Sequence, residues 1–366
     1  MLTQDDLARL AQSLSGARVL SVYVDLTARD PAQKQAWRTR LDDGLRRIRD
    51  GIAADRQDER AALSRAVDHM EARLASDLDA GGARSWVAFA TERQVHHAET
   101  LPVHAPGVVA WGEGPRVAPY LRLLRARRAV ILAEVNAEGA RLYRYFDGNL
   151  ESLEHLRAHV ATDSHDHMGS MPRQGFHTGT RGATGTDAAQ RELRAGTRRM
   201  LHELARRLVT LAGADSWIVI GGTPVPAKAA LAALPDALAS RTLLTPALHV
   251  WASEAQIRDA AARGAAALED AHDLASVSAA VERAARAGRG ATGIDATLGA
   301  LATGAVEDLY VSDRFLERSP REAEDAVRAA LGHGARPRIV CGDAAGLLND
   351  TAQGIAARLR YTSVVS

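Results

Sequence analysis

The sequence lacks the cysteines that hold many small secreted domains together. Cys341 is the only cysteine in the 366-residue chain, which excludes a disulfide framework and a cysteine-based zinc site. It ends an apolar run at residues 337–341. Because free cysteines in such runs are usually buried, we expect a strand residue here rather than a nucleophile.

Aromatic residues and long apolar runs are also scarce. Aromatic side chains make up 4% of the chain, which argues against a base-stacking platform like that of single-strand-binding proteins. No apolar run approaches the roughly 20 residues that span a bilayer. The first residues form an amphipathic pattern without a signal peptide. We therefore expect a cytoplasmic protein with no membrane partner.

Charge is balanced over the whole chain and concentrated in one segment. A net charge of +1 excludes binding by overall charge alone, so any nucleic-acid contact must come from a local patch. Residues 173–207 hold eight arginines and three acidic residues, a local net charge of +5. Here a Gly-rich stretch, expected to form a long surface loop over 163–187, leads into a basic helix. The segment suits a polyanion, and we expect RNA rather than DNA.

The basic helix should begin near Asp187, whose side chain can cap the first turn. Its large apolar residues recur at helical spacing, which predicts one buried face. These residues are Leu193, Met200, Leu201, Leu204 and Leu208. The arginines then occupy the remaining, solvent-facing part of the helix.

Strand and helix patterns alternate along the chain, which predicts an α/β protein. Expected strands cover residues 18–25, 86–90, 94–98, 128–135, 140–145, 216–221, 248–251, 308–312, 338–341 and 358–364. Expected helices cover residues 1–15, two segments between 31 and 75, 119–127, 227–234, 253–287, 293–304, 321–331 and 347–357. We predict three domains: an N-terminal α/β domain (1–125), a middle α/β domain with the long loop (126–252) and a C-terminal α/β/α sandwich (253–366).

Two motifs of the last domain resemble a known family. Residues 293–313 and 332–361 resemble the C-terminal domain of the archaeal and eukaryotic class-1 peptide release factors and of Pelota. The matching residues of the first motif are Thr297, Leu298, Ala300, Leu301, Gly304, Ala305, Val306 and Glu307. Those of the second are Gly334, Ala335, Ile339, Val340, Gly354, Ile355, Ala357, Leu359, Arg360 and Tyr361. Two separated motifs in the family's order make the resemblance specific.

The middle segment follows the same family layout. A hairpin at 129–145, a Gly-rich loop, a basic helix and a strand at 217–222 occur in the family's order. The family's loop carries Arg-Gly-Gly-Gln, whose glutamine helps water attack peptidyl-tRNA. This chain has Arg181-Gly182-Ala183-Thr184, so the glutamine is replaced by Thr184. The chain therefore resembles bacterial members of this superfamily, the Balon-like ribosome hibernation factors, over residues 126–366, and over 1–125 by position alone.

The resemblance implies a ribosome-binding factor without release activity. It implies occupancy of the A site, with the loop toward the peptidyl-transferase centre, in hibernation or in rescue of stalled ribosomes. A translational GTPase such as elongation factor Tu would be a further partner. We expect contacts with ribosomal RNA from Arg173, His177, Thr180, Arg181, Gly182, Ala183, Thr184, Gly185, Arg191, Arg194, Arg198 and Arg199. No catalytic residue, cofactor or metal is expected.

Other interpretations of the sequence remain open. The chain could be a peptidyl-tRNA hydrolase in which Thr184 positions water, although a lone hydroxyl without a base is a poor activator. It could also be an RNA- or protein-binding adaptor unrelated to the ribosome. His155 and His159 have metal-ligand spacing but lack the His-Glu-x-x-His pattern of a zinc helix.

Two further segments allow more than one reading. Arginines 116, 122, 125, 127 and 128 form a second basic cluster, either a solvated helix face or another RNA contact. Residues 221–228 follow a strand and open a helix but lack the Gly-Lys-Ser/Thr ending of a P-loop, so we expect a tight turn.

Overall fold

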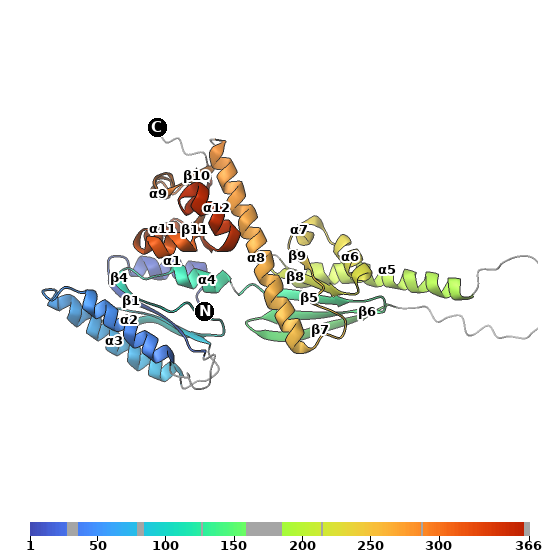
Figure 1. The fold of residues 1–366 in the computed structure, drawn as a ribbon, viewed down its shortest axis with the longest axis horizontal. Helices are drawn as coiled ribbons and strands as arrows, with labels where there is room; N and C mark the ends of the chain where they lie inside the picture. The colour runs from blue at the N-terminus through green and yellow to red at the C-terminus, as the bar shows by residue number, and fades with distance from the viewer. Residues whose placement is uncertain are drawn as a thin grey trace, which may run out of the picture. The chain divides into compact units, whose positions relative to one another are not determined.

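The chain folds into two compact units, described here from a computed structural model. The structure describes residues 1–27, 36–78, 84–125, 127–158, 185–213, 215–286 and 288–361, and of residues 185–190 the backbone alone. The first unit combines residues 1–127 with 270–366, and the second comprises residues 128–269 (Figure 1). The mixed α/β class expected from the sequence is confirmed in all three sheets.

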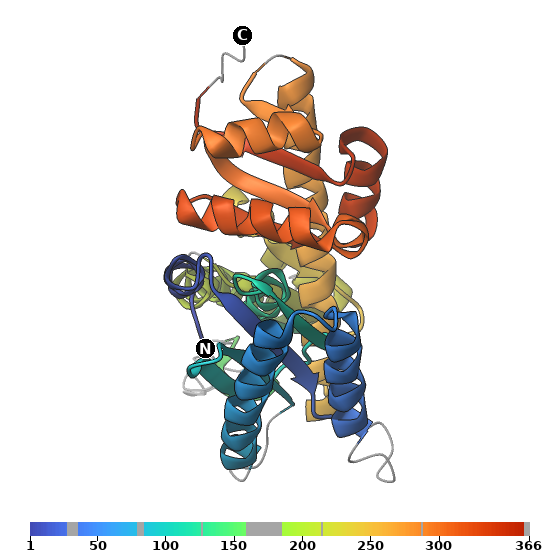
Figure 2. The same cartoon turned by 90° about the vertical axis from the view of Figure 1, so that its left-hand side faces the viewer.

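The first sheet of the first unit is antiparallel, in the order β3-β2-β1-β4. Its strands are β1 (Arg18–Asp25), β2 (Ser85–Ala90), β3 (Val95–Leu101) and β4 (Val108–Glu113). Helices α2 (Ala36–Gly51) and α3 (Gln57–Leu78) cover one face, seen as the two blue helices in Figure 2. Helices α1 (Gln4–Ser13) and α4 (Ala118–Arg125) pack on the other. Strand β4 was not expected from the sequence.

The second sheet of this unit forms the expected α/β/α sandwich, in the order β10-β13-β11-β12. Its strands are β10 (Gly290–Thr292), β11 (Val306–Ser312), β12 (Arg336–Val340) and β13 (Ile355–Leu359). One face packs on α9 (Ile294–Ala302) and α11 (Pro320–Gly332), and α10 (Asp313–Arg318) lies between β11 and α11 in the chain. The other face packs on α12 (Gly342–Ala352) and on residues 270–285 of α8 (Glu254–Ala285).

The end of this domain differs from the sequence-based prediction. A helix was expected at 347–357, but α12 ends at Ala352 because Gln353 takes a left-handed conformation and closes it. At Gly354, with φ +89°, a Cβ atom would lie 2.6 Å from Cβ of Phe315. The chain therefore turns directly into β13 at Ile355, three residues before the strand expected at 358–364, and β13 ends at Leu359, five residues before the expected end.

The two sheets of the first unit share one hydrophobic core. Leu7 of α1 and Val117, just before α4, belong to the same buried cluster as Leu301 and Val327 of the C-terminal segment. The stretches predicted as the first and third domains are thus packed into one unit. The division of the chain into three domains, with boundaries at residues 125 and 253, stays a prediction.

The second unit is built on a five-stranded mixed sheet in the order β7-β6-β5-β8-β9. Its strands are β5 (Val130–Val135), β6 (Gly139–Phe146), β7 (Asn149–Arg157), β8 (Trp217–Gly222) and β9 (Thr242–Leu244). The expected hairpin is confirmed, since β5 and β6 pair antiparallel. Helices α5 (Gly185–Ala212) and α6 (Pro224–Ala232) cover one face, and residues 254–269 of α8 pack on the other. The short α7 (Asp236–Ala239) precedes β9.

The prediction of a last strand of this unit at residues 248–251 is wrong. These residues form a turn, and Leu248 is fully buried beside the Gly221–Gly222 pair. The N–H of Gly222 donates to the carbonyl of Leu248. A Cβ on Gly222, where φ is +103°, would lie 2.0 Å from the carbonyl oxygen of Val135. The two glycines therefore serve close backbone approach, in agreement with the tight turn expected there.

No helix among the described residues is long and apolar enough to cross a membrane.

Candidate nucleic-acid interface

Helix α5 carries the arginines that the sequence singled out. It begins at Gly185, two residues before the expected cap at Asp187. Met200, Leu201, Leu204 and Leu208 are buried against the sheet, as predicted. Leu193 is 41% exposed, so this prediction is wrong. The large apolar side chains buried by α5 thus start at Met200, about two turns later than the spacing indicated.

The first half of α5 presents positive charge to solvent. Arg191, Arg194, Arg198 and Arg199 are all exposed. Arg194 and Arg198 are one turn apart and form no ion pair within the described part of the chain. Like charges at this spacing destabilise a helix by a few tenths of a kcal/mol. A ligand of opposite charge would offset this cost.

The second half of α5 is different because its arginines are neutralised. Arg206 pairs with Glu203, and Arg207 lies 3.1 Å from Glu203 and 3.3 Å from Glu154 of β7. These ion pairs hold the helix to itself and to the edge strand. Among the described arginines of α5, Arg194 and Arg198 are therefore the ones whose charge no ion pair neutralises.

The middle of α5 is tied to the β5–β6 turn. Thr197 donates from Oγ1 to the carbonyl of Ala137 at 2.8 Å. The Asn136 side chain accepts hydrogen bonds from the N–H groups of Glu138 and Gly139, at 2.8 and 2.7 Å. The turn is held by its own hydrogen bonds to Asn136 and by the hydrogen bond from Thr197 of α5. The exposed arginines therefore lie on a helix that is fixed to the sheet.

The expected loop contacts lie outside the described residues. These are Arg173, His177, Thr180, Arg181, Gly182, Ala183 and Thr184. Gly185 is the first residue of α5. The roles assigned to these residues stay predictions. The metal interpretation of His155 and His159 is likewise untested at His159, and the described residues contain no cluster of metal-ligating side chains.

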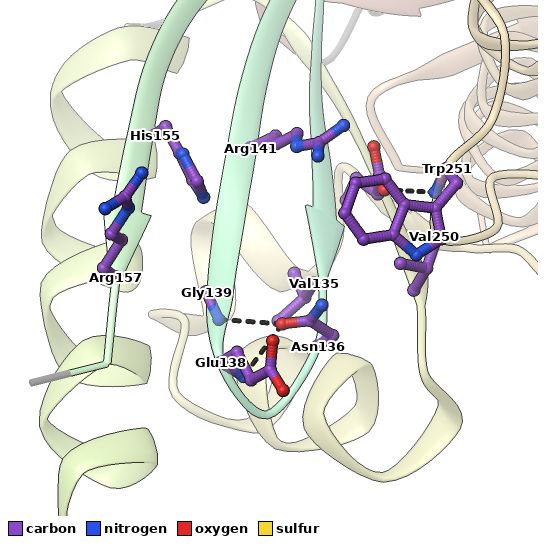
Figure 3. A pocket seen from close by; sticks show the side chains of 10 residues that line it. Val135, Asn136, Glu138, Gly139, Arg141, His155, Arg157, Val250 and Trp251 are labelled. Carbon is purple, nitrogen blue, oxygen red and sulfur yellow. Dashed lines mark hydrogen bonds between the residues drawn. The ribbon is translucent and has the colours of Figure 1, made fainter. Parts of the chain in front are cut away.

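A pocket on the opposite face of this sheet escaped the sequence analysis. Glu134, Arg141 and His155 are cross-strand neighbours on β5, β6 and β7. They form one row across the sheet, and the pocket they line also includes Arg157 and Trp251 (Figure 3). On the face of β6 that points away from α5, the residues are Arg141, Tyr143 and Tyr145. This run of one charged and two aromatic side chains at every second position could have indicated the pocket.

Three arginines of the second basic cluster make structural contacts, whereas Arg122 is exposed on α4, as the solvated helix face would have it. Arg125 lies 2.7 Å from the buried carboxylate of Asp273 and donates to the carbonyl of Ile339. Arg128 stacks on the buried ring of Trp217 with its guanidinium carbon 4.4 Å from the ring centroid. Arg116 donates to the carbonyl of Pro320. These arginines connect elements inside their own units.

Cys341 also departs from expectation. It lies one residue beyond β12 and precedes α12, and it is half-buried rather than part of the strand core. Burial raises the pKa of its thiol, so the neutral form dominates near neutral pH. Because the thiolate is the nucleophilic form, a mainly neutral thiol supports the expectation that Cys341 is not a nucleophile.

The middle of the chain matches a family model. Residues 115–266 match the model of a family described as bacterial archaeo-eukaryotic release factor family 10. This match supports the resemblance to the archaeal and eukaryotic release factors over a stretch that holds both the β5–β6 hairpin and α5. No curated protein sequence matches the chain.

Several solved structures are similar at low identity. Pelota from Archaeoglobus fulgidus is 14% identical over 98% of this chain and 93% of its own, with a TM-score of 0.41. An archaeal Pelota in a ribosome-bound model with ABCE1 is 13% identical over 98% and 94%, with a TM-score of 0.39. Dom34 from S. cerevisiae, a translation termination-like factor, is 10% identical over 66% of each chain, with a TM-score of 0.41.

Proposed function

We propose that this chain, whose residues 115–266 match a release-factor family, is a ribosome-binding factor that acts without releasing the nascent peptide. It would occupy the A site of idle or stalled ribosomes, in hibernation or rescue, in the cytoplasm. The observation that carries the proposal is the exposed arginine face of α5 at residues 191–199, placed inside the matched stretch.

Charge and geometry support RNA as the ligand of this face. Arginine side chains bind phosphate oxygens through charge-assisted hydrogen bonds, and such contacts provide most non-specific affinity for nucleic acids. The face precedes the half of α5 whose arginines are neutralised. The hydrogen bond from Thr197 to the carbonyl of Ala137 fixes this part of the helix to the β5–β6 turn. A helix held in this way can direct its arginines into a cavity walled by RNA.

The segment before α5 gives the proposal its second part. Its expected contacts, Arg173 to Thr184, would lie toward the peptidyl-transferase centre. Thr184 stands where the family has its glutamine, and a single hydroxyl lacks the base needed to activate water. Elongation factor Tu, or another translational GTPase, would deliver or hold the factor.

Ribosome co-sedimentation of a double variant tests the arginine face. Arg194→Gln with Arg198→Gln removes two phosphate contacts. Ribosome binding should weaken several-fold at moderate salt, and the salt dependence should become shallower by about one unit of slope per lost contact. The matched control is Arg258→Gln with Arg263→Gln, which removes two exposed arginines from α8 of the same unit. Equal sedimentation of the test and control variants would refute the proposal.

A peptide-release assay on ribosomes loaded with peptidyl-tRNA tests the absence of hydrolysis. We expect no release above the background without factor. Release that disappears in Thr184→Ala would establish the hydrolase alternative instead.

A further inference from the structure

The pocket beside the β5–β6 turn has the features of a binding site for an unpaired nucleotide. We infer that it stacks one base of single-stranded RNA on the Trp251 ring and holds the adjacent backbone with Arg157 and His155. The inference rests on the proposed function, since it assigns a second RNA contact to the same unit as the arginine face of α5.

Trp251 presents an aromatic surface to solvent. Its side chain is 74% exposed, whereas Trp86 and Trp217 are buried. Figure 3 shows its ring beside the end of Arg141, and the guanidinium carbon lies 4.6 Å from the ring centroid. Arg141 thus supports the ring from the sheet. The exposed indole surface offers the kind of platform on which RNA-binding proteins stack splayed-out bases.

The backbone conformation of Trp251 indicates that this exposure is imposed. Its φ is +68°, in the left-handed region that bulky side chains rarely adopt. The strain is held by Glu134, which is 4% exposed and accepts a hydrogen bond from the Trp251 N–H at 2.8 Å. Strained residues of this kind cluster at functional sites, where the surrounding structure maintains them. A buried carboxylate that holds an exposed tryptophan is therefore a positioning device.

The polar side chains of the pocket suit the rest of a nucleotide. Arg157 and His155 follow one another on the same face of β7, and neither forms an ion pair or side-chain hydrogen bond within the described part of the chain. Arg157 can donate to phosphate oxygens. Glu138, at the turn in Figure 3, offers an acceptor for a base edge. The pocket thus combines an aromatic platform, a cationic side and one acceptor.

Single-stranded RNA accounts for these features better than a duplex does. A duplex keeps its bases stacked inside, so an exposed indole would find no π-face. Stacking tolerates any base, and its affinity is supplied mainly by the ring and the flanking positive charge. Arg141 behind the ring and Arg157 on the opposite side of the pocket supply that charge.

Fluorescence anisotropy of labelled octa-adenylate RNA with the full chain at low ionic strength tests the site. Trp251→Ala should weaken binding about 10-fold, within the range that aromatic stacking contributes. Trp251→Phe should retain most of the affinity because phenylalanine also stacks. The matched control is Trp37→Ala on α2, where Arg38 lies over the ring with its guanidinium carbon 5.1 Å from the centroid. This control should bind as the wild type does.

The outcomes separate this site from the proposed function. Wild-type affinity in a folded Trp251→Ala variant, or no binding of octa-adenylate by the wild type, overturns the site whatever the ribosome assay gives. Loss of octa-adenylate binding in Trp251→Ala, with no co-sedimentation of the wild type, supports the site and overturns the proposed function. Circular dichroism of each variant verifies the fold.

Discussion

Glu324 shows how a single buried residue ties two segments of the first unit together. It lies on α11, is 2% exposed and accepts hydrogen bonds from the N–H groups of Val117 and Ala118, at 3.0 and 3.3 Å. Burial raises the pKa of its carboxyl to about 7, although these bonds and Arg116 favour the charged form. The carboxyl therefore binds a proton more tightly in the folded chain than in the unfolded chain.

This gives a pH-dependent stability with a defined sign. The folded pKa exceeds the unfolded value of 4.5, so the contribution is full below about pH 4.5 and is lost as pH rises to about 7. Between these limits the group lowers the free energy of unfolding by up to about 3 kcal/mol. Glu324→Gln, a neutral mimic that can still accept from Val117, should lack this dependence.

Urea unfolding at pH 5 and pH 8 measures the effect. The free energy of unfolding of the variant minus that of the wild type should be larger at pH 8 than at pH 5. A difference between the two proteins that is the same at both pH values would show that Glu324 does not titrate in this window.

At the scale of elements, the Gly221–Gly222 end of β8 positions both candidate surfaces of the second unit. Gly222 packs on Val135, the last residue of β5, and leads into α6. The same strand end is next to the turn that Thr197 holds and to the Leu248–Trp251 segment. Close backbone contact at this point therefore determines where Trp251 lies.

Gly222→Ala should destabilise the second unit by at least about 2 kcal/mol, because backbone atoms cannot yield to the added Cβ. Gly213→Ala is a useful control, since its φ is +55° but no atom lies within 4 Å of the added Cβ. It should cost about 1 kcal/mol from the left-handed conformation alone. Thermal unfolding compares the two, and equal losses would contradict the steric argument.

At the scale of the whole molecule, the first unit is assembled from the two ends of the chain. Leu7 of α1 is fully buried in a core that also contains Val327 of α11. Residues more than 300 apart in sequence thus stabilise one another. Cooperative unfolding of both sheets is the expected consequence.

Leu7→Ala tests this cooperativity. The truncation should cost about 2–5 kcal/mol, as for other buried leucines. Hydrogen exchange should then accelerate together in β1 and β11. Faster exchange in β1 with unchanged protection in β11 would instead support three independent domains, as predicted from the sequence. Leu193→Ala, at an exposed position of α5, should leave both strands protected.

The sequence by itself determined the elements whose patterns are local. Strand β1 was predicted at its observed limits, Arg18–Asp25, and the β5–β6 hairpin and the basic α5 were also predicted. Alternation with period two and apolar spacing near 3.6 depend only on neighbours along the chain. The exposure of Arg194 and Arg198 follows from the same periodicity.

Only the tertiary structure decided which distant residues meet. Trp251 lies in a turn that was expected to be a strand, and its exposure depends on a bond to Glu134, 117 residues away. The low aromatic content pointed away from base stacking, yet a single ring supported by Arg141 suffices for one base. Arg125 appeared as surface charge until Asp273 was brought beside it. Such pairings come from packing over long sequence separations, which no local pattern encodes.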